Sequence, residues 1–210
     1  MNLGFLVFPD VEELDFAGPW ELAGLWGKFF GGPAERWIVA ETAAPVVCAK
    51  GLSVLPHLTC DACPRLDALV VPGGQGTRRE VDNPRLIRFI AEQGAGGAQV
   101  LSICTGAFLL QRAGLLAGKT ATAHWNSLDR LRALPDVAVA EERWVRADRV
   151  WSAAGVSAGL DLMLAFIAET AGSDVAGRVQ LAAEYYPAGV RYGTWPPGVA
   201  LPAYLRNAAR

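Results

Sequence analysis

Continuous apolar runs alternate along the chain with longer segments in which apolar residues recur at helical spacing. The runs at residues 3–8, 67–72 and 100–102 predict strands that are buried on both faces, because such strands carry no polar side. Further strands are predicted at residues 36–42 and 120–123. Helices are predicted from Pro19 onward, where proline suits the first helical position, and over residues 83–93, 106–113, 127–134, 158–171 and 173–184.

Shorter strand-like segments lie between these elements. Residues 46–55 predict a hairpin that turns at Lys50–Gly51. Residues 137–140 predict one short strand, and residues 143–146 and 150–152 predict a second hairpin, which turns at Asp148.

Strands that alternate with helices predict an α/β fold. We expect a single-domain, flavodoxin- or Rossmann-like sandwich in which helices cover both faces of a mostly parallel sheet. No internal repeat, linker or low-complexity segment divides residues 1–210, so one domain is expected. Residues 185–210 are rich in proline, glycine and aromatic residues, and we expect a C-terminal arm there, either packed or forming a partner surface.

Composition narrows the function classes. Hydrophobic residues make up 52% of the chain and charged residues 19%, which is typical of an ordered enzyme-like core. The net charge is −2 and no basic run is present, so nucleic acid is not an expected partner. No apolar run is long enough to span a membrane, and the N-terminus lacks the pattern of a signal peptide. We therefore expect a cytoplasmic protein with four reduced cysteines.

Cys104 is the main candidate for chemistry. It lies between the strand at residues 100–102 and a helix that begins at once with Thr105 and Gly106, as in a nucleophile elbow, although the G-x-S-x-G signature is absent. Unpaired N–H groups and the partial positive charge of a helix N-terminus favour a thiolate at this position. The alternative is a small core residue, since free cysteine is often buried.

Two other segments are expected to meet Cys104. Asp15 follows the first strand and Gly73–Gly74 follows the strand at residues 67–72, and ligand sites of parallel sheets lie at the carboxyl ends of their strands. Asp15 alone would also suit a helix cap or turn, and the glycines an ordinary turn. No Lys-Ser/Thr pair follows the glycines, which excludes a phosphate-binding P-loop.

The remaining cysteines and histidines give weaker indications. Cys60 and Cys63 form a C-x-x-C, but a second ligand pair for zinc is missing, and Pro64 follows where a thioredoxin-like motif would begin a helix. His124 could approach Cys104 from the end of the strand at residues 120–123, or could simply stack beside Trp125. His57 lies in a connection and receives no role.

Several of these motifs together resemble the ThiJ/PfpI superfamily, whose fold is of the class I glutamine amidotransferase type. They are LDFAGPWE, VPGG, SICTGAFLLQRAGLLAGKTATAHW and AGVSAGLDLMLAFIAETAG, and they extend over nearly the whole chain. Within the superfamily they are similar to the isonitrile hydratase branch and, equally, to the sensor domains of AraC-type transcription regulators.

The resemblance implies roles for individual residues. Cys104 matches the family nucleophile and Asp15 its acidic partner, while the N–H groups of Gly74 and Thr105 match the polar cradle near the sulfur. Gly73, Ala17 and His124 are further candidates for the pocket.

Two departures from related groups matter. PfpI-type proteases place histidine directly after the cysteine, whereas this chain has Thr105, so peptidase activity is not expected. AraC-type regulators continue into a helix-turn-helix domain, whereas this sequence ends at Arg210, so a DNA-binding role would need a separate partner.

The activity implied by the resemblance is cofactor-free and metal-free hydration of isonitriles to N-substituted formamides by Cys104 and Asp15. Two alternatives use the same pocket: glyoxalase- or deglycase-like chemistry on 2-oxoaldehydes, and non-enzymatic sensing of a small molecule or of oxidation. The resemblance also implies a homodimer.

Overall fold

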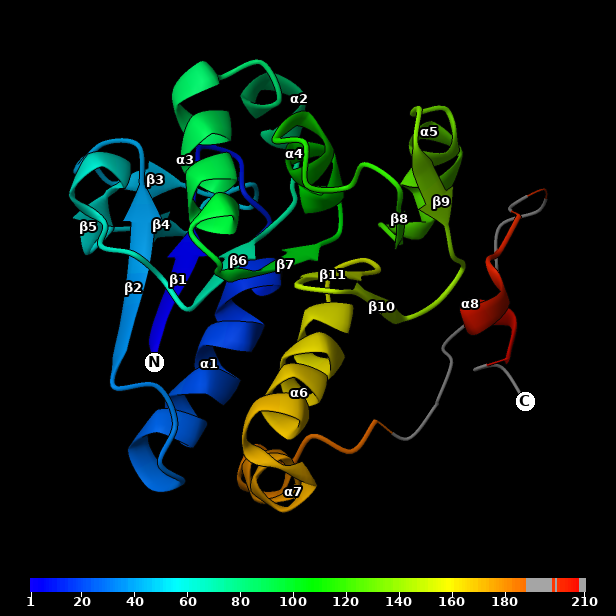
Figure 1. Ribbon diagram of the computed structural model, residues 1–210. Coiled ribbons are helices and arrows are strands. Elements are labelled where there is room, and N and C mark those ends of the chain that lie inside the picture. Colours follow the sequence, from blue (N-terminus) through cyan, green and yellow to red (C-terminus); the bar gives the residue numbers. More distant parts are fainter. Residues whose placement is uncertain (188–197, 199, 208–210) are drawn as a thin grey trace.

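A seven-stranded sheet forms the centre of the computed structural model, which describes residues 1–187, 198 and 200–207 (Figure 1). Neighbouring strands of this sheet are parallel, except that β10 at one edge is antiparallel to β11. The order across the sheet is β10 (Trp144–Ala147), β11 (Val150–Ala153), β7 (Gln99–Ile103), β6 (Ala68–Val71), β1 (Asn2–Leu6), β2 (Glu35–Ala40) and β5 (Leu58–Thr59).

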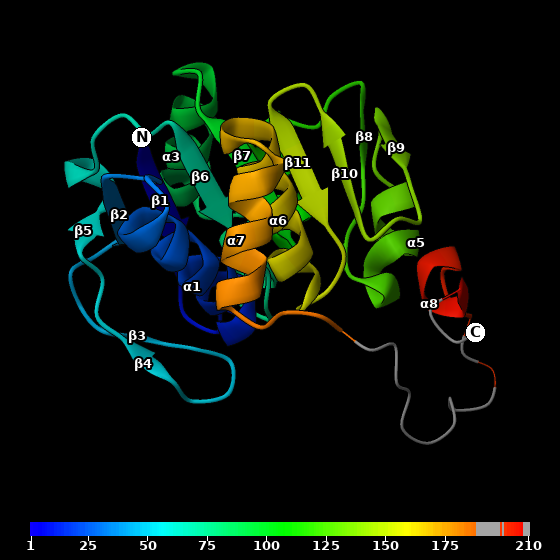
Figure 2. The same ribbon diagram turned by 90° about the horizontal axis from the view of Figure 1, so that it is seen from below.

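Helices cover both faces of this sheet, as the alternating pattern predicts (Figures 1 and 2). One face carries α1 (Glu13–Phe29), α6 (Ala158–Ala171) and α7 (Ser173–Ala182), and the other carries α2 (Thr77–Glu80), α3 (Pro84–Ala95) and α4 (Gly106–Arg112). The inner strands β1, β6 and β7 are almost entirely buried between these layers. Burial of each large apolar side chain there, such as Phe5 or Leu101, contributes about 1.5–3 kcal/mol to the free energy of folding.

Two small sheets lie beside the main one. The hairpin predicted at residues 46–55 is present as β3 (Val46–Val47) and β4 (Ser53–Val54). The strand predicted at 120–123 is β8 (Lys119–Ala121), which pairs in parallel with β9 (Val137–Val139) outside the main sheet. The predicted hairpin of β10 and β11 turns at Asp148, whose φ is 59°.

The first helix begins earlier than the sequence indicates. We expected it to start at Pro19, but α1 starts at Glu13 and contains Pro19. Proline inside a helix removes one hydrogen bond and costs about 3 kcal/mol, so the sequence predicts a helix that starts at Pro19. Tertiary contacts override this cost, because Phe16, Leu22 and Trp26 are buried on α1. Asp15 therefore lies in the first turn of the helix and not ahead of it.

Other differences are local. The predicted helix at 127–134 is divided into the 3-10 turn η2 (Trp125–Ser127) and α5 (Leu128–Arg132), and α7 ends two residues early. The short elements α2, β5 and η1 (Cys60–Ala62) have no clear sequence pattern. Of the C-terminal arm predicted at 185–210, residues 188–197, 199 and 208–210 lie outside the described residues; α8 (Ala203–Asn207) is a helix. Among the described helices, none has the length and apolar character needed to cross a bilayer.

Candidate thiol site

Four adjacent strands end at one edge of the sheet and bring the predicted residues together. Asp15 follows β1, Gly73 and Gly74 follow β6, and Cys104 follows β7. The fourth strand, β11, is followed by the turn Ala154–Gly155, and the Ala154 carbonyl accepts a hydrogen bond from the Cys104 N–H. We call Asp15, Gly73, Gly74, Cys104 and Thr105 the thiol site.

Cys104 sits on a strained turn between β7 and α4. Its φ is 58°, in the left-handed region that non-glycine residues rarely adopt and that costs about 1–3 kcal/mol. The Cys104 N–H holds the turn by donating to the carbonyls of Ala153 and Ala154, both at 3.1 Å. Gly106 lets the helix approach β6, since a Cβ there would lie 2.2 Å from the Val71 carbonyl oxygen. This is the geometry of a nucleophile elbow.

Asp15 is a fully buried carboxyl group directed at this turn. Its Oδ2 accepts a 2.8 Å hydrogen bond from the Gly73 N–H. Its Oδ1 has no partner of ordinary hydrogen-bond geometry among the described residues. Burial raises the pKa of Asp15 well above its usual range, against the Gly73 N–H and the nearby Cys104 thiol, which lower it. The raised pKa makes Asp15 a better proton acceptor than an ordinary carboxylate.

The structure corrects the expectation of a resting thiolate at Cys104. Burial, and then the charge of Asp15, raise the pKa of the thiol to about 12, although hydrogen bonds from Thr105 oppose the shift. The two groups affect each other's pKa but do not meet in a hydrogen bond of ordinary geometry. Desolvation outweighs the donors of the elbow because Cys104 is only 7% exposed. The resting sulfur is therefore a thiol, and Asp15 is the neighbouring group that can accept its proton.

Thr105, more than Gly74, supplies the donors near the sulfur. Both the N–H and the side chain of Thr105 lower the pKa of Cys104 by hydrogen bonding. The Gly74 N–H, which we expected to face the sulfur, instead donates to Thr105 Oγ1 at 3.0 Å. Thr77 Oγ1 donates to the Gly74 carbonyl at 2.8 Å, and the Thr105 hydroxyl can donate to the same carbonyl at 3.2 Å.

Gly73 and Gly74 are required for this close packing. A Cβ on Gly73 would lie 2.5 Å from the Thr105 nitrogen and 2.9 Å from the Cys104 Cβ. Gly74 has a φ of 120°, and a Cβ there would lie 2.4 Å from the Asp10 carbonyl oxygen. Gly73 thus allows the β6 loop to touch the elbow, and Gly74 allows it to touch the segment before α1.

An ion pair beside the site was not expected from the sequence. Glu12, whose N–H donates to the Gly73 carbonyl at 3.0 Å, forms an ion pair with Lys50 in the β3–β4 turn. The charge of Glu12 raises the pKa of both Asp15 and Cys104, and Lys50 lowers that of Asp15. The sequence predicts a hairpin turn at Lys50–Gly51, but nothing in it indicates that this turn meets Glu12.

The structure places His124 at the rim of the site without joining it to the pair. Its ring packs against Gly155, where a Cβ would lie 2.1 Å from Cδ2, and beside Trp125 with ring centroids 5.7 Å apart. Its Nδ1 accepts the Asn126 N–H at 3.3 Å, so a neutral ring carries its proton on Nε2. Burial lowers the pKa of His124. No hydrogen bond between His124 and Cys104 or Asp15 is present among the described residues.

Two further residues complete the surroundings. Ala17 lies half-buried on α1, two residues after Asp15, and packs against the core. Tyr204 on α8 is half-buried, and burial raises its pKa to about 12, with a smaller contribution from the charge of Cys104. Tyr204 belongs to the predicted arm, where composition gave no indication of a place near the sulfur.

The other cysteines and His57 lie away from the thiol site. Cys60 and Cys63 are free thiols at the two ends of the η1 turn, and burial raises their pKa values to about 12 and 11. His57 stacks on Trp20 at 5.6 Å, and its Nδ1 accepts the Ile38 N–H at 2.8 Å. Among the described residues, no three His, Cys, Asp or Glu side chains gather in a way that could hold a metal ion.

Comparison with known proteins identifies a family and several similar chains. The model of the DJ-1/PfpI family matches residues 1–169. An isonitrile hydratase from Pseudomonas putida is 38% identical over 189 residues, which are 90% of this chain and 80% of the relative.

Other similar proteins belong to different functional classes. The HTH-type transcriptional regulator CdhR of Pseudomonas aeruginosa is 30% identical over 83% of this chain, which spans 52% of the regulator. The crystal structure of a ThiJ/PfpI family protein from Pseudomonas syringae aligns with a TM-score of 0.83 and 34% identity, covering 99% of this chain and 83% of that one.

Proposed function

The chain belongs to the DJ-1/PfpI family, and from this premise we propose that it hydrates isonitriles to N-substituted formamides at the thiol site. One observation carries the proposal: a buried carboxyl group with a raised pKa lies beside a thiol at a nucleophile elbow. The similarity to an isonitrile hydratase over most of both chains supports it.

The first step joins the sulfur to the substrate. The Cys104 thiol proton passes to Asp15, and the sulfur forms a bond to the terminal carbon of the isonitrile. Asp15 then delivers this proton to the same carbon, which gives a thioimidate, Cys104–S–CH=N–R. The thiol hydrogen is thus used in full, so a cysteine that rests protonated suits the reaction.

The second step returns the enzyme to its starting state. A water molecule, activated by Asp15, attacks the thioimidate carbon, and the nitrogen gains a proton. The carbon–sulfur bond then breaks, Cys104 recovers its proton through Asp15, and R–NH–CHO leaves. The Thr105 N–H and hydroxyl stabilise negative charge on the sulfur in both steps. In sum, R–NC and water give R–NH–CHO, and the reaction uses no metal, organic cofactor or oxidant.

The direct test is an assay of purified protein with simple alkyl and aryl isonitriles. Formamide should appear only while Cys104 is reduced, as measured by thiol titration and intact mass. Absence of formamide from reduced protein would overturn the proposal. The same preparation should be assayed with methylglyoxal, because chemistry on 2-oxoaldehydes through a hemithioacetal at Cys104 would produce lactate instead.

A sensor of oxidation is less well supported than an enzyme. Peroxide attacks thiolates, and a thiol with a pKa of about 12 holds very little thiolate at neutral pH. Intact mass after mild peroxide, compared with Cys104→Ser, should show slow oxidation at this residue. A single oxygen adduct that forms rapidly at Cys104 would favour the sensor.

We further propose a cytoplasmic homodimer. Large apolar side chains are exposed near the thiol site, at Leu14 on α1 and at Val47 and Leu52 on the β3–β4 hairpin. A partner copy would cover such a patch. The aromatic tail that also suggested a dimer lies mostly outside the described residues. Light scattering at micromolar concentration should give the dimer mass, and a monomer would contradict this.

A further inference from the structure

A cavity of about 660 Å³ lies apart from the thiol site, on the other side of α2. Its walls are mostly apolar and come from the ends of β1 and β2, the loop between β2 and β3, and the start of α3. They include Phe8, Ala40, Pro45, Val46 and Leu86. The volume is typical of small-molecule sites. None of the residues of the thiol site lines it.

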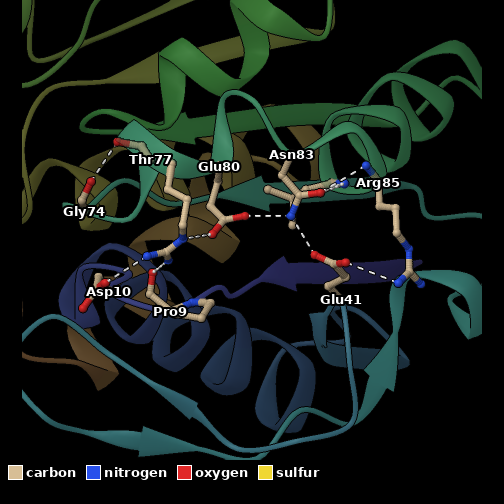
Figure 3. Close-up of polar contacts among 10 residues, drawn as sticks. Pro9, Asp10, Glu41, Gly74, Thr77, Glu80, Asn83 and Arg85 are labelled. Atoms are coloured by element: carbon tan, nitrogen blue, oxygen red, sulfur yellow. Dashed lines mark hydrogen bonds and ion pairs between the residues drawn. The ribbon is translucent and has the colours of Figure 1, made fainter.

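Two carboxylates meet at the polar side of this cavity. Asn83 Nδ2 donates to Glu41 Oε2 at 2.6 Å and to Glu80 Oε2 at 2.8 Å (Figure 3). Glu80 is only 5% exposed, on α2, and Glu41 follows β2 on the facing wall. The Asn83 amide is fixed, because its Oδ1 accepts the N–H groups of Arg85 and Leu86 as the cap of α3.

The neighbouring arginines are occupied by other acceptors. Arg79 donates to Glu80 at 2.8 Å, to the Pro9 carbonyl at 2.9 Å and to Asp10 at 3.4 Å (Figure 3). Arg85 donates to Glu41 at 3.3 Å and to Asp61 at 2.7 Å. Each carboxylate oxygen can accept two hydrogen bonds, so Glu41 and Glu80 retain free acceptor positions. This side of the cavity can therefore bind a ligand that donates hydrogen bonds and carries positive charge.

We propose that this cavity, lined by Glu41, Glu80, Asn83 and the apolar walls, binds a small organic cation: a protonated amine on an apolar body. The ammonium group would donate to Glu41 and Glu80, and the body would pack on Phe8, Val46 and Leu86. An anionic ligand would meet two carboxylates and engaged arginines. We call this site the cation cavity. The proposal does not depend on isonitrile hydration.

The test uses three probes of similar size with different charge. Phenethylamine is the cation, 2-phenylethanol the neutral analogue and 3-phenylpropionate the anion, each titrated into the full chain by calorimetry and ligand-observed NMR. We expect the amine to bind at least about tenfold more tightly than the other two, which corresponds to about 1.4 kcal/mol. Equal binding of the alcohol or the acid, or no binding of the amine up to about 10 mM, would overturn the proposal.

Two variants locate the binding. Glu41→Gln keeps an oxygen acceptor for Asn83 and removes one charge. It should lower the affinity for phenethylamine at least about tenfold. Ala44→Trp, at an exposed position of the cavity wall, should block binding without changing any charge. Glu169→Gln removes an exposed carboxylate on α6, outside the cavity, and should bind like the parent protein. Parent-like affinity in both Glu41→Gln and Ala44→Trp would overturn the assignment.

Discussion

The thiol site and the cation cavity use buried carboxyl groups in opposite ways. At the thiol site, Asp15 has a hydrogen bond to one oxygen only, and burial raises its pKa. In the cation cavity, Glu80 is held by Arg79 and Asn83. The first arrangement makes a carboxyl group with a raised pKa, and the second holds both carboxylate oxygens in place with donors from two side chains.

The comparison also separates volume from reactivity. The cation cavity offers about 660 Å³, yet none of the cysteines or histidines lines it. We place the proposed chemistry at the thiol site, because two groups that affect each other's pKa are fixed there on neighbouring strand ends. Size indicates where a ligand fits, and coupled titratable groups indicate where bonds change.

Replacing the Cys104 sulfur should give the largest difference between the thiol site and the cation cavity. Cys104→Ser should lower isonitrile hydration by about 10³-fold or more, because an alcohol is a far weaker nucleophile than a thiol. Phenethylamine binding should not change. Cys63→Ser, on the η1 turn, is the matched control and should keep full activity. Formamide formation at the parent rate in Cys104→Ser would remove the thiol site from the mechanism.

Removing the proton carrier should have the next largest effect. Asp15→Asn keeps an acceptor for the Gly73 N–H but cannot transfer a proton, so kcat should fall by about 10²–10⁴-fold. The parent protein should lose activity as the pH falls through the raised pKa of Asp15, where the pair gains a second proton. A pH profile of kcat measures both effects. An unchanged acid limb in Asp15→Asn would contradict the assignment.

Asp15 should also lower the stability of the fold at neutral pH. Its pKa is raised in the folded state, so the folded chain binds more protons than the unfolded chain between about 3.8 and that raised value. Its contribution is therefore most favourable below pH 3.8 and is lost as the pH rises through the folded pKa. Thermal unfolding should show Asp15→Asn more stable than the parent protein at pH 8, and this difference should shrink toward pH 4. A constant difference across this range would contradict the raised pKa.

Thr105→Val should have a smaller effect, because it removes one hydroxyl and leaves the Thr105 N–H in place. We expect hydration to fall by about 10- to 100-fold, somewhat less than the loss of a full oxyanion donor. The rate of Cys104 alkylation by iodoacetamide should fall too, since the thiolate loses a donor. Thr105→Ser keeps the hydroxyl and should restore most of both rates. Equal rates in Val and Ser variants would place the Thr105 function in its backbone alone.

The smallest effect is expected at His124. Its ring is not bonded to Cys104 or Asp15 in the described structure, so His124→Gln should change kcat by less than about threefold. Thermal unfolding provides the control for loss of packing against Gly155. A fall of about 10²-fold with an unchanged unfolding temperature would make His124 part of the proton path.

Much of the fold and part of the thiol site were predictable from the chain. The alternating strands and helices predicted the covered parallel sheet, and the confirmed fold has that form. The order of elements placed Asp15, Gly73 and Cys104 at neighbouring strand ends, because a parallel sheet brings its carboxyl ends to one edge. These features depend on local pattern and on general rules of connection, both of which a sequence carries.

Only the tertiary structure decided the protonation of Cys104, the direction of the Gly74 N–H, the Glu12–Lys50 ion pair and the cation cavity. Each depends on distances between groups far apart in the chain: Asp15 and Cys104 come from different strand ends, and Glu41 and Glu80 from facing walls. The position of Cys104 at a helix start predicts a thiolate, but burial raises the pKa of the thiol. The sequence cannot show this, because desolvation depends on everything packed around the sulfur. The sequence therefore determined which strand ends meet, and packing determined how burial shifts the pKa values of Asp15 and Cys104.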